Sequence, residues 1–401
     1  MEQYFNKTSK DWRLGLCCQF HDRDLATKFN ANTTTKTYFL KDNSRARTAA
    51  TRNVDKLRWI MEYLATQPKN FRCYRMTSEM FPVYTLPEAQ EFYDGFIGLL
   101  IEKLKIAGKV AIENEIRLSM HPGQYTVLGS RDKEVVKKAI EDIEYHCLIG
   151  KGMGIPAEDF SVNIHLQGLY GGKHIDGIKR FASNFQYLSD YAQKALSVEN
   201  EDKPNGYDIE HTLELAQRIP IKCTLDIHHY ACHRMRDTEK VKNSEGKLVN
   251  RKIRDEVRHI TVNDDFFKEA VKTWKGRRPL FHKSQSFPIE DEGYWMKVNA
   301  HSDIYYDEEL MALATPMLEY ADFDVEDERR ELHLEDGAGG AAETGFAEDL
   351  CLIGCRRAIA NSLMAMPGAC GVSGVKGSLD DTFLPSGSEI KACDLPDISH
   401  L

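Results

Sequence analysis

The chain has 401 residues, of which 42% are hydrophobic and 29% charged, so it holds enough apolar sequence for one large packed domain or two smaller ones. Its formal net charge of -9 argues against a surface coated in positive charge for unspecific nucleic-acid binding. The first residues are polar, no apolar run reaches the ~18 residues of a membrane span, and the ten cysteines form no regular framework. We therefore expect no membrane partner and a cytoplasmic protein, nuclear if the source is eukaryotic, and not a secreted one.

Short apolar segments alternate with longer amphipathic stretches, which is typical of a parallel α/β protein. Between the strands lie helical patterns with apolar residues at three- and four-residue steps, for example at 45–67, 87–108 and 175–194. The expected strands are at 13–18, 71–77, 117–121, 160–166, 195–200, 223–229, 279–283 and 321–326. Eight strands with helical crossovers predict a closed (β/α)8 TIM barrel. A doubly wound open sheet is disfavoured, because the residues after Gly15 form no glycine-rich phosphate turn.

Two segments differ from the barrel pattern. Residues 234–278 carry 14 Lys/Arg against 8 Asp/Glu, a balance of +6, and we expect a basic insert there, which is most simply a solvated helix face of mixed charge. Residues 336–401 hold 10 of the 27 glycines and little periodicity, so we expect a disordered tail. The predicted domains are thus a barrel over 1–335 and a tail over 336–401. The tail's Cys351 and Cys355 have no second ligand pair nearby, so we expect no metal there.

Metal-type ligands fall at the ends of nearly all expected strands from the third onward. They are His121, His165, Glu199, Asp226, His229, His282 and Glu326, and His301 adds a loop position. In a (β/α)8 barrel the carboxyl ends of the strands meet at one mouth. A single His at a strand end is more often structural, but five histidines and three carboxylates in one mouth are too costly unless metal ions offset their desolvation and repulsion. Mixed imidazole and carboxylate ligands favour Mn, Zn or Fe over Ca or Mg.

Several motifs occur together in a defined order along the chain. They are RLGLCC, YRMTSEMFP, RLSMHPGQY, NIHLQG followed by YGGK, VENED, LDIHH, FHKS and HSDI. Over roughly residues 13–331 the chain thereby resembles the UV damage endonuclease family. The resemblance implies a TIM barrel of the endonuclease IV and xylose isomerase kind, with two or three divalent ions, usually manganese. It also implies hydrolysis of the phosphodiester 5′ to pyrimidine dimers, 6-4 photoproducts or abasic sites in duplex DNA.

The resemblance also assigns roles to residues. It implies that the eight positions named above bind metal, with Glu199, His229 and Glu326 serving catalysis, and that Gln124 and Tyr125 probe the damaged duplex. Glu199, in the middle of the strand order, is placed to bridge two ions. The cations at Lys173, Lys283 and 277–278 are candidate phosphate contacts, although solvent-exposed cations would look the same. The expected partner is damaged duplex DNA, and the expected state is a monomer.

Three departures indicate a divergent member. Leu280 stands where the family usually has a metal-site lysine, Leu16 stands where an aromatic residue usually grips the lesion, and residues 326–331 differ from the usual motif. Two alternative functions therefore stay open at this point. The same barrel would suit an abasic-site endonuclease or a sugar isomerase. A catalytically degenerate protein that only binds damaged DNA is the other reading.

Overall fold

The computed structural model describes part of the chain. The described residues are 12–20, 23–203, 205–234, 238–242, 246–253, 260–284, 290–291, 294–295, 317 and 319–325. The expected tail over 336–401 lies outside them, as do the candidate ligands His301 and Glu326. Among the helices of the described part, none is long and apolar enough to cross a membrane.

Eight parallel strands form one sheet, in the order β6-β5-β4-β3-β2-β1-β12-β9. They are β1 (Leu14–Cys17), β2 (Cys73–Met76), β3 (Arg117–Met120), β4 (Ser161–His165), β5 (Leu196–Glu199), β6 (Lys222–Thr224), β9 (Leu280–Lys283) and β12 (Asp322–Val325). Beyond β6, Asp226 forms a parallel bridge with His282, and His282 N donates to Leu225 O at 2.9 Å. This bridge brings β9 back to the segment after β6, so the sheet is nearly closed into the barrel that the sequence predicts.

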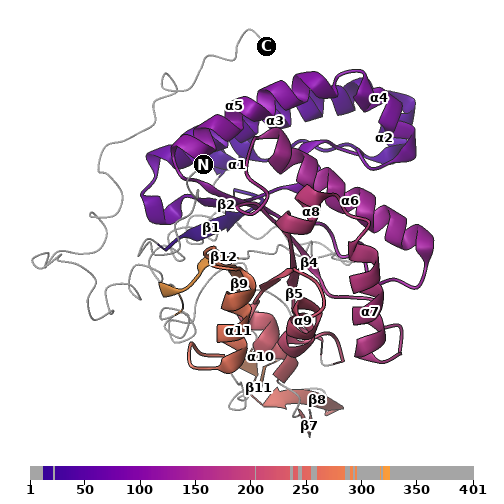
Figure 1. Ribbon diagram of the computed structural model, residues 1–401, viewed down its shortest axis with the longest axis vertical. Coiled ribbons are helices and arrows are strands. Elements are labelled where there is room, and N and C mark those ends of the chain that lie inside the picture. Colours follow the sequence, from indigo (N-terminus) through magenta and orange to yellow (C-terminus); the bar gives the residue numbers. More distant parts are fainter. Residues whose placement is uncertain are drawn as a thin grey trace, which may run out of the picture. The chain divides into compact units, whose positions relative to one another are not determined.

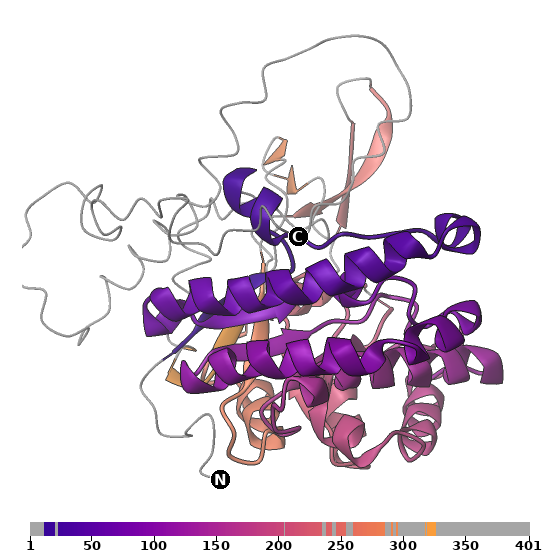
Figure 2. The ribbon, with the colours of Figure 1, turned by 90° about the horizontal axis from the view of Figure 1, so that it is seen from above.

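Helices surround the strands, as Figure 1 shows. They are α1 (Arg23–Phe29), α2 (Lys36–Lys41), α3 (Ser44–Thr66), α4 (Gln90–Asp94), α5 (Ile97–Glu113), α6 (Lys133–Gly152), α7 (His174–Phe185), α8 (Asp190–Ala195), α9 (Ile209–Ala216), α10 (Ile227–Arg234) and α11 (Asp265–Thr273). In Figure 2, α3, α5 and α6 lie side by side along the sheet. The stretch expected as one helix at 175–194 is two, because Ser189 caps α8 by accepting a hydrogen bond from Ala192 N at 3.2 Å.

The strands alternate between a face toward the helices and a face toward the barrel interior. On the helix side, Phe281 of β9 packs against Phe267 of α11 and Phe323 of β12, with ring centroids 5.8 and 6.1 Å apart. On the inner side, Asp322 and Asp324 of β12 contact residues of β3, which is not a neighbour of β12 in the sheet. These contacts therefore pass through the interior of the barrel, and polar groups occupy part of it.

The amino ends of the strands are held by one buried carboxylate and several arginines. Asp322 Oδ2 accepts from Arg117 Nη1 at 2.8 Å, and Asp322 Oδ1 accepts from Arg278 Nε at 2.6 Å and from Arg13 N at 2.9 Å. Arg277 is ion-paired with Asp159. The pair at 277–278 is thus engaged in ion pairs near the starts of the strands, away from the mouth, which corrects its assignment as a phosphate contact.

The basic insert contains the expected kind of helix face in α11 (Asp265–Thr273), whose exposed lysines pair with acidic residues, but the insert is not helical throughout. Part of it is an antiparallel hairpin, with β7 (Thr238–Lys242) paired to β8 (Leu248–Ile253), and β8 pairs in turn with β11 (Tyr294–Trp295) and β11 with β10 (Glu290–Asp291). Gly246 between β7 and β8 has a φ of +76°, which glycine adopts without strain.

Candidate metal centre

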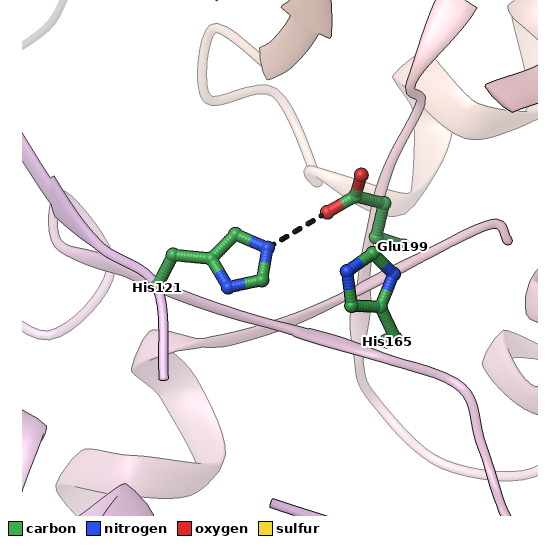
Figure 3. Close-up of side chains that lie close together, drawn as sticks. All are labelled: His121, His165 and Glu199. Carbon is green, nitrogen blue, oxygen red and sulfur yellow. Dashed lines mark hydrogen bonds and ion pairs between the residues drawn. The ribbon is translucent and has the colours of Figure 1, made fainter. Parts of the chain in front are cut away.

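Glu199 is the last residue of β5, and its buried carboxylate lies among imidazole rings. Its Oε2 is 3.2 Å from His121 Nε2 and 3.1 Å from His282 Nδ1, while its Oε1 is 3.1 Å from His229 Nδ1. Asn163 Nδ2 of β4 also donates to Oε2. Figure 3 shows His121 and Glu199 pointing toward each other with the ring of His165 beside them. The carboxylate expected at the centre of the site therefore lies where four strand ends meet.

Four histidines lie around this carboxylate. His121 follows β3 directly and His165 ends β4, and their ring centroids are 5.2 Å apart. His121 and His282 are 5.7 Å apart by the same measure, and His165 and His229 are 5.6 Å apart. Of the eight expected ligands, the structure thus brings together the six that it describes. We call His121, His165, Glu199, Asp226, His229 and His282 the histidine–carboxylate cluster.

Two groups within this cluster have ligand geometry. The ligand atoms of His121, His165 and Glu199 lie within 4.8 Å of one another, and those of Glu199, Asp226 and His282 do so as well. Glu199 belongs to both groups, His121, His165, Asp226 and His282 each belong to one, and His229 belongs to neither. A carboxylate has two oxygens, so Glu199 is the residue that two ions could share.

Asp226 and His229 reach the cluster by a route that the sequence did not predict. The strand expected over 223–229 ends at Thr224, and α10 begins at Ile227. Asp226 Oδ1 accepts a hydrogen bond from His229 N at 2.6 Å, which is the side-chain contact that starts a helix. The expectation of a strand through His229 is therefore wrong, and this candidate ligand comes from the first turn of a helix.

Asn200 connects these two candidate ligands to β5 and was not among the predicted site residues. Its Oδ1 accepts from Asp226 N at 2.9 Å, and its Nδ2 donates to Asp226 O at 3.0 Å. Its own carbonyl oxygen lies 2.9 Å from His229 Nδ1. A ring nitrogen that donates to a backbone carbonyl leaves the other nitrogen, here Nε2, with the lone pair that a metal requires. The sequence signal was its position directly after Glu199.

The charges in the cluster favour an ionised carboxylate. Burial by itself would raise the pKa of Glu199, but the charges of His282 and His165 and the contacts with His121 and His229 together hold this pKa well below its usual range. A carboxylate that stays ionised while fully buried is in the form that binds a cation.

The donor set fits a divalent metal ion. Imidazole nitrogens and carboxylate oxygens are the ligands of Mn, Fe and Zn sites. Glu199 Oε1 is buried and accepts no hydrogen bond among the described residues, although His229 Nδ1 lies 3.1 Å away. An unsatisfied buried oxygen of this kind is costly unless a cation occupies the space beside it.

The predicted DNA-probing pair lies on the loop after His121. Gln124 and Tyr125 are both exposed, and the Tyr125 side chain is 85% exposed. The loop is anchored beneath them, because Thr126 N donates to Gly123 O at 3.0 Å and the Thr126 hydroxyl donates to Asp142. The exposed aromatic ring thus follows a candidate ligand by four residues.

The other predicted positions differ in accessibility. Lys173 is exposed at the start of α7, whereas Lys283, at the end of β9, is buried. Leu280 is buried at the start of β9, two residues before His282, and Leu16 of β1 is partly buried. Of the two cations, only Lys173 is therefore exposed enough to meet a phosphate in this conformation.

Comparison with known proteins gives a consistent pattern. A family model described as UV-endonuclease UvdE matches residues 12–311. The UV DNA damage endonuclease of Clostridium perfringens is 29% identical over 207 residues, which are 50% of this chain and 47% of that protein. That of Bacillus cereus is 34% identical over 157 residues, or 39% of this chain and 47% of that protein. The chain thus spans about half the length of the curated relatives it matches.

A solved structure with a similar fold comes from the same family by its name. The crystal structure of SacUVDE superposes with a TM-score of 0.62 at 23% identity, covering 79% of this chain and 92% of that one. At this identity the likeness shows that the two chains share the fold.

Proposed function

The chain belongs to the UV-endonuclease UvdE family, and from that premise we propose that it is a metal-dependent DNA repair endonuclease. Its reaction would be hydrolysis of the phosphodiester 5′ to a UV lesion, either a pyrimidine dimer or a 6-4 photoproduct, or to an abasic site. The observation that carries the proposal is the sharing of Glu199 by two groups of candidate ligands.

The residues divide into those that would hold metal and those that hold the ligands in place. His121 and His165 with Glu199 would hold one ion, and Asp226 and His282 with Glu199 a second. Divalent ions bound there would stabilise the negative charge that develops on the phosphodiester oxygens during hydrolysis. We propose manganese, with two or three ions per chain, the third depending on residues outside the described part.

Two asparagines would hold the candidate ligands in place before substrate arrives. Asn163 donates to Glu199, and Asn200 binds both the backbone of Asp226 and the ring of His229. Ligands that are held by such hydrogen bonds need little reorganisation when metal and substrate bind. Glu199 and His229 are therefore our candidates for the residues nearest the reacting phosphate, together with Glu326 as a sequence-based expectation.

Tyr125 supports DNA as the substrate rather than a small sugar. A sugar bound at the mouth would have no use for an aromatic ring that is 85% exposed on the loop after a candidate ligand. A base that is unstacked by damage can stack on such a ring, and Gln124 can hydrogen-bond to the partner base. Damaged duplex DNA is accordingly the proposed partner. We propose that the protein binds it as a monomer.

A nicking assay tests this proposal. Purified protein with Mn2+ is incubated with duplexes that carry one pyrimidine dimer, one 6-4 photoproduct, one abasic site or no lesion. We expect cleavage on the 5′ side of the lesion, no cleavage of the intact duplex, and loss of activity in EDTA. Cleavage of the abasic duplex alone would support the abasic-site alternative. Equal cleavage of damaged and intact DNA would overturn the repair assignment, and tight damaged-DNA binding without cleavage would support the degenerate binding protein.

A further inference from the structure

His282 lies between two buried carboxylates. Its Nδ1 is 3.1 Å from Glu199 Oε2, and its Nε2 is 3.9 Å from Asp324 Oδ2. We propose that Asp324 is a positioning residue of the metal centre, which holds the ring of His282 so that Nδ1 faces Glu199 and the ion. The inference rests on the metal centre of the proposed function. It assigns a role to a carboxylate outside the predicted ligand set.

The backbone register brings Asp324 to this place. Asp324 of β12 is paired with His282 of β9 on one side and with Gly15 of β1 on the other. Residues paired in parallel strands point to the same face of the sheet, and the contact of Asp324 with Ser119 of β3 shows that this face is the barrel interior. The carboxylate is therefore built into the interior next to the ring that it is proposed to orient.

Gly15 provides the space that this carboxylate occupies. A Cβ atom at residue 15 would lie 2.5 Å from Asp324 Oδ1 and 2.9 Å from Cys73 Sγ. Both distances are shorter than van der Waals contact, so no larger residue fits beside Asp324 without displacing it. The close packing of the Asp324 carboxylate against β1 thus explains why residue 15, in the RLG segment, is a glycine.

Neutral donors hold Asp324 but do not balance its charge. Ser119 Oγ donates to Oδ2 at 2.7 Å, and Cys73 Sγ lies 3.5 Å from Oδ1. Within the part of the chain that the structure describes, neither Arg nor Lys pairs with Asp324. Asp322 on the same strand, also 0% exposed, is bound by three arginines instead. A buried carboxylate is costly without a nearby positive charge, so Asp324 requires one from another source.

A metal ion on the opposite side of His282 would supply that charge. When Nδ1 of an imidazole binds a cation, the N–H at Nε2 becomes a stronger donor, and carboxylates commonly accept from the second nitrogen of such histidines. At 3.9 Å, Nε2 and Oδ2 are farther apart than in a hydrogen bond, so the expected attraction is that of an N–H at Nε2 for a nearby carboxylate. The attraction nevertheless acts in a water-excluded interior, where it is stronger than at the surface. Asp324 and the ion would thus stabilise each other through one ring.

The alternative is that Asp324 only ties β12 to β3 through Ser119. In that case its removal would lower the stability of the fold and leave metal affinity unchanged. The two roles are therefore separated by measuring metal binding and metal-free stability on the same variants.

The test compares Asp324→Asn with Asp322→Asn, two neutral replacements of equally buried carboxylates on one strand. Mn2+ is titrated into metal-free protein and free Mn2+ is followed by electron paramagnetic resonance, while Tm is measured without metal. We expect Asp324→Asn to weaken Mn2+ binding by about 10- to 100-fold with little change in Tm. Asp322→Asn should lower Tm and leave the affinity of the folded protein unchanged.

A second pair keeps the test decisive if Asp322→Asn fails to fold. Ser119→Ala removes the hydroxyl that holds Asp324, whereas Thr212→Val removes a buried hydroxyl of α9 that donates to Ile209 O at 2.8 Å instead. Only Ser119→Ala should weaken Mn2+ binding. Unchanged binding in Asp324→Asn, or equal weakening in both members of a pair, would overturn this inference while leaving the metal centre intact. A wild-type chain that binds no Mn2+ would overturn the metal centre of the proposed function and this inference with it.

Discussion

Asn200 and Asp226 hold each other by two hydrogen bonds, one in each direction. Asp226 N donates to Asn200 Oδ1 at 2.9 Å, and Asn200 Nδ2 donates to Asp226 O at 3.0 Å. Because Asn200 follows Glu199 in the chain, this pair fixes the end of β5 to the ligand that follows β6. The distance between two of the candidate ligands is therefore set by an amide that binds no metal itself.

Replacing this amide should loosen the metal centre. Asn200→Ala removes both hydrogen bonds. The buried N–H of Asp226 loses the Asn200 acceptor, whereas Asp226 O still accepts from Tyr230 N at 3.1 Å, so the change should cost about 1–3 kcal/mol of unfolding free energy. We expect weaker Mn2+ binding as well, because Asp226 loses the side chain that anchors it, although the backbone carbonyl of residue 200 still contacts His229. Asn184→Ala is the matched control, since Asn184 Nδ2 donates to Leu128 O at 2.8 Å outside the cluster. Denaturant unfolding and Mn2+ titration of both variants provide the measurement, and equal Mn2+ affinity in the two would contradict the anchoring role.

The shared carboxylate should be indispensable. Glu199→Gln keeps the size of the side chain and removes its charge, so we expect loss of tightly bound metal and a fall in turnover of several orders of magnitude, with the fold retained. Glu201→Gln serves as the control, because Glu201 Oε2 accepts from Tyr207 N at 2.9 Å and belongs to neither ligand group. Elemental analysis after identical dialysis and single-turnover cleavage would decide. Retention of full metal content in Glu199→Gln would show that Glu199 does not bridge ions.

Much of the barrel and of the ligand set could be predicted from the sequence. Strands of apolar residues that end in His or Glu are local patterns, and the expected and observed strands agree within a few residues, as for 160–166 and β4 (Ser161–His165). The end of β6 could not be predicted, because it depends on the bond from His229 N to Asp226. The role proposed for Asp324 could not be predicted for a similar reason, since its contacts are with strands that are far apart in the sequence.

Tyr125 should govern recognition of damage and not metal binding. Tyr125→Ala should reduce the preference for damaged over intact duplex, because base stacking on an aromatic ring contributes about 1–3 kcal/mol. Its Mn2+ content should match that of the unmodified protein. Tyr187→Ala is a suitable control, because Tyr187 is 66% exposed and follows α7 rather than the loop after His121. Competition binding with dimer-containing and intact duplexes gives the ratio, and an unchanged ratio would remove the probing role.

Leu280 bears on the number of ions. An apolar residue cannot bind metal, so we expect fewer than three tightly held ions per chain. Leu280→Lys with bicarbonate should raise metal content if a carbamate forms there, since this would add an anionic ligand two residues before His282. The opposing effect is that an unmodified lysine would be a buried cation, and Leu280 pairs in register with Asp322, which already binds three arginines. Elemental analysis with and without bicarbonate distinguishes the two, and three firmly held ions in the unmodified chain would contradict the prediction.

Lys222 should make the stability of the barrel depend on pH. This side chain is buried at the start of β6, where its Nζ donates to Phe160 O at 3.0 Å and lies 5.1 Å from the ring centroid of Trp274. Burial, with a further contribution from the charge of Arg117, lowers the pKa of Lys222 to about 7 from its usual 10.5. Between these two values the unfolded chain binds more protons than the folded chain at this residue, so the contribution of Lys222 to the free energy of unfolding increases as pH rises from 7 toward 10.5.

The predicted slope is at most about 1.4 kcal/mol per pH unit, and it applies only inside this window. Below pH 7 both states are protonated at Lys222, so the full cost of burying the charge is present and no longer varies. Lys222→Met keeps the length of the aliphatic stem and removes the titration, whereas exposed Lys194→Met serves as the control. Urea unfolding of the three proteins at pH 7, 8 and 9 gives the difference in stability between each variant and the unmodified chain. As pH rises, the unmodified chain should gain stability relative to Lys222→Met. The difference between the unmodified chain and Lys194→Met should stay constant. A difference that is independent of pH in Lys222→Met would show that the lysine stays charged in the folded barrel, with Asp159 and Phe160 O stabilising the ammonium group.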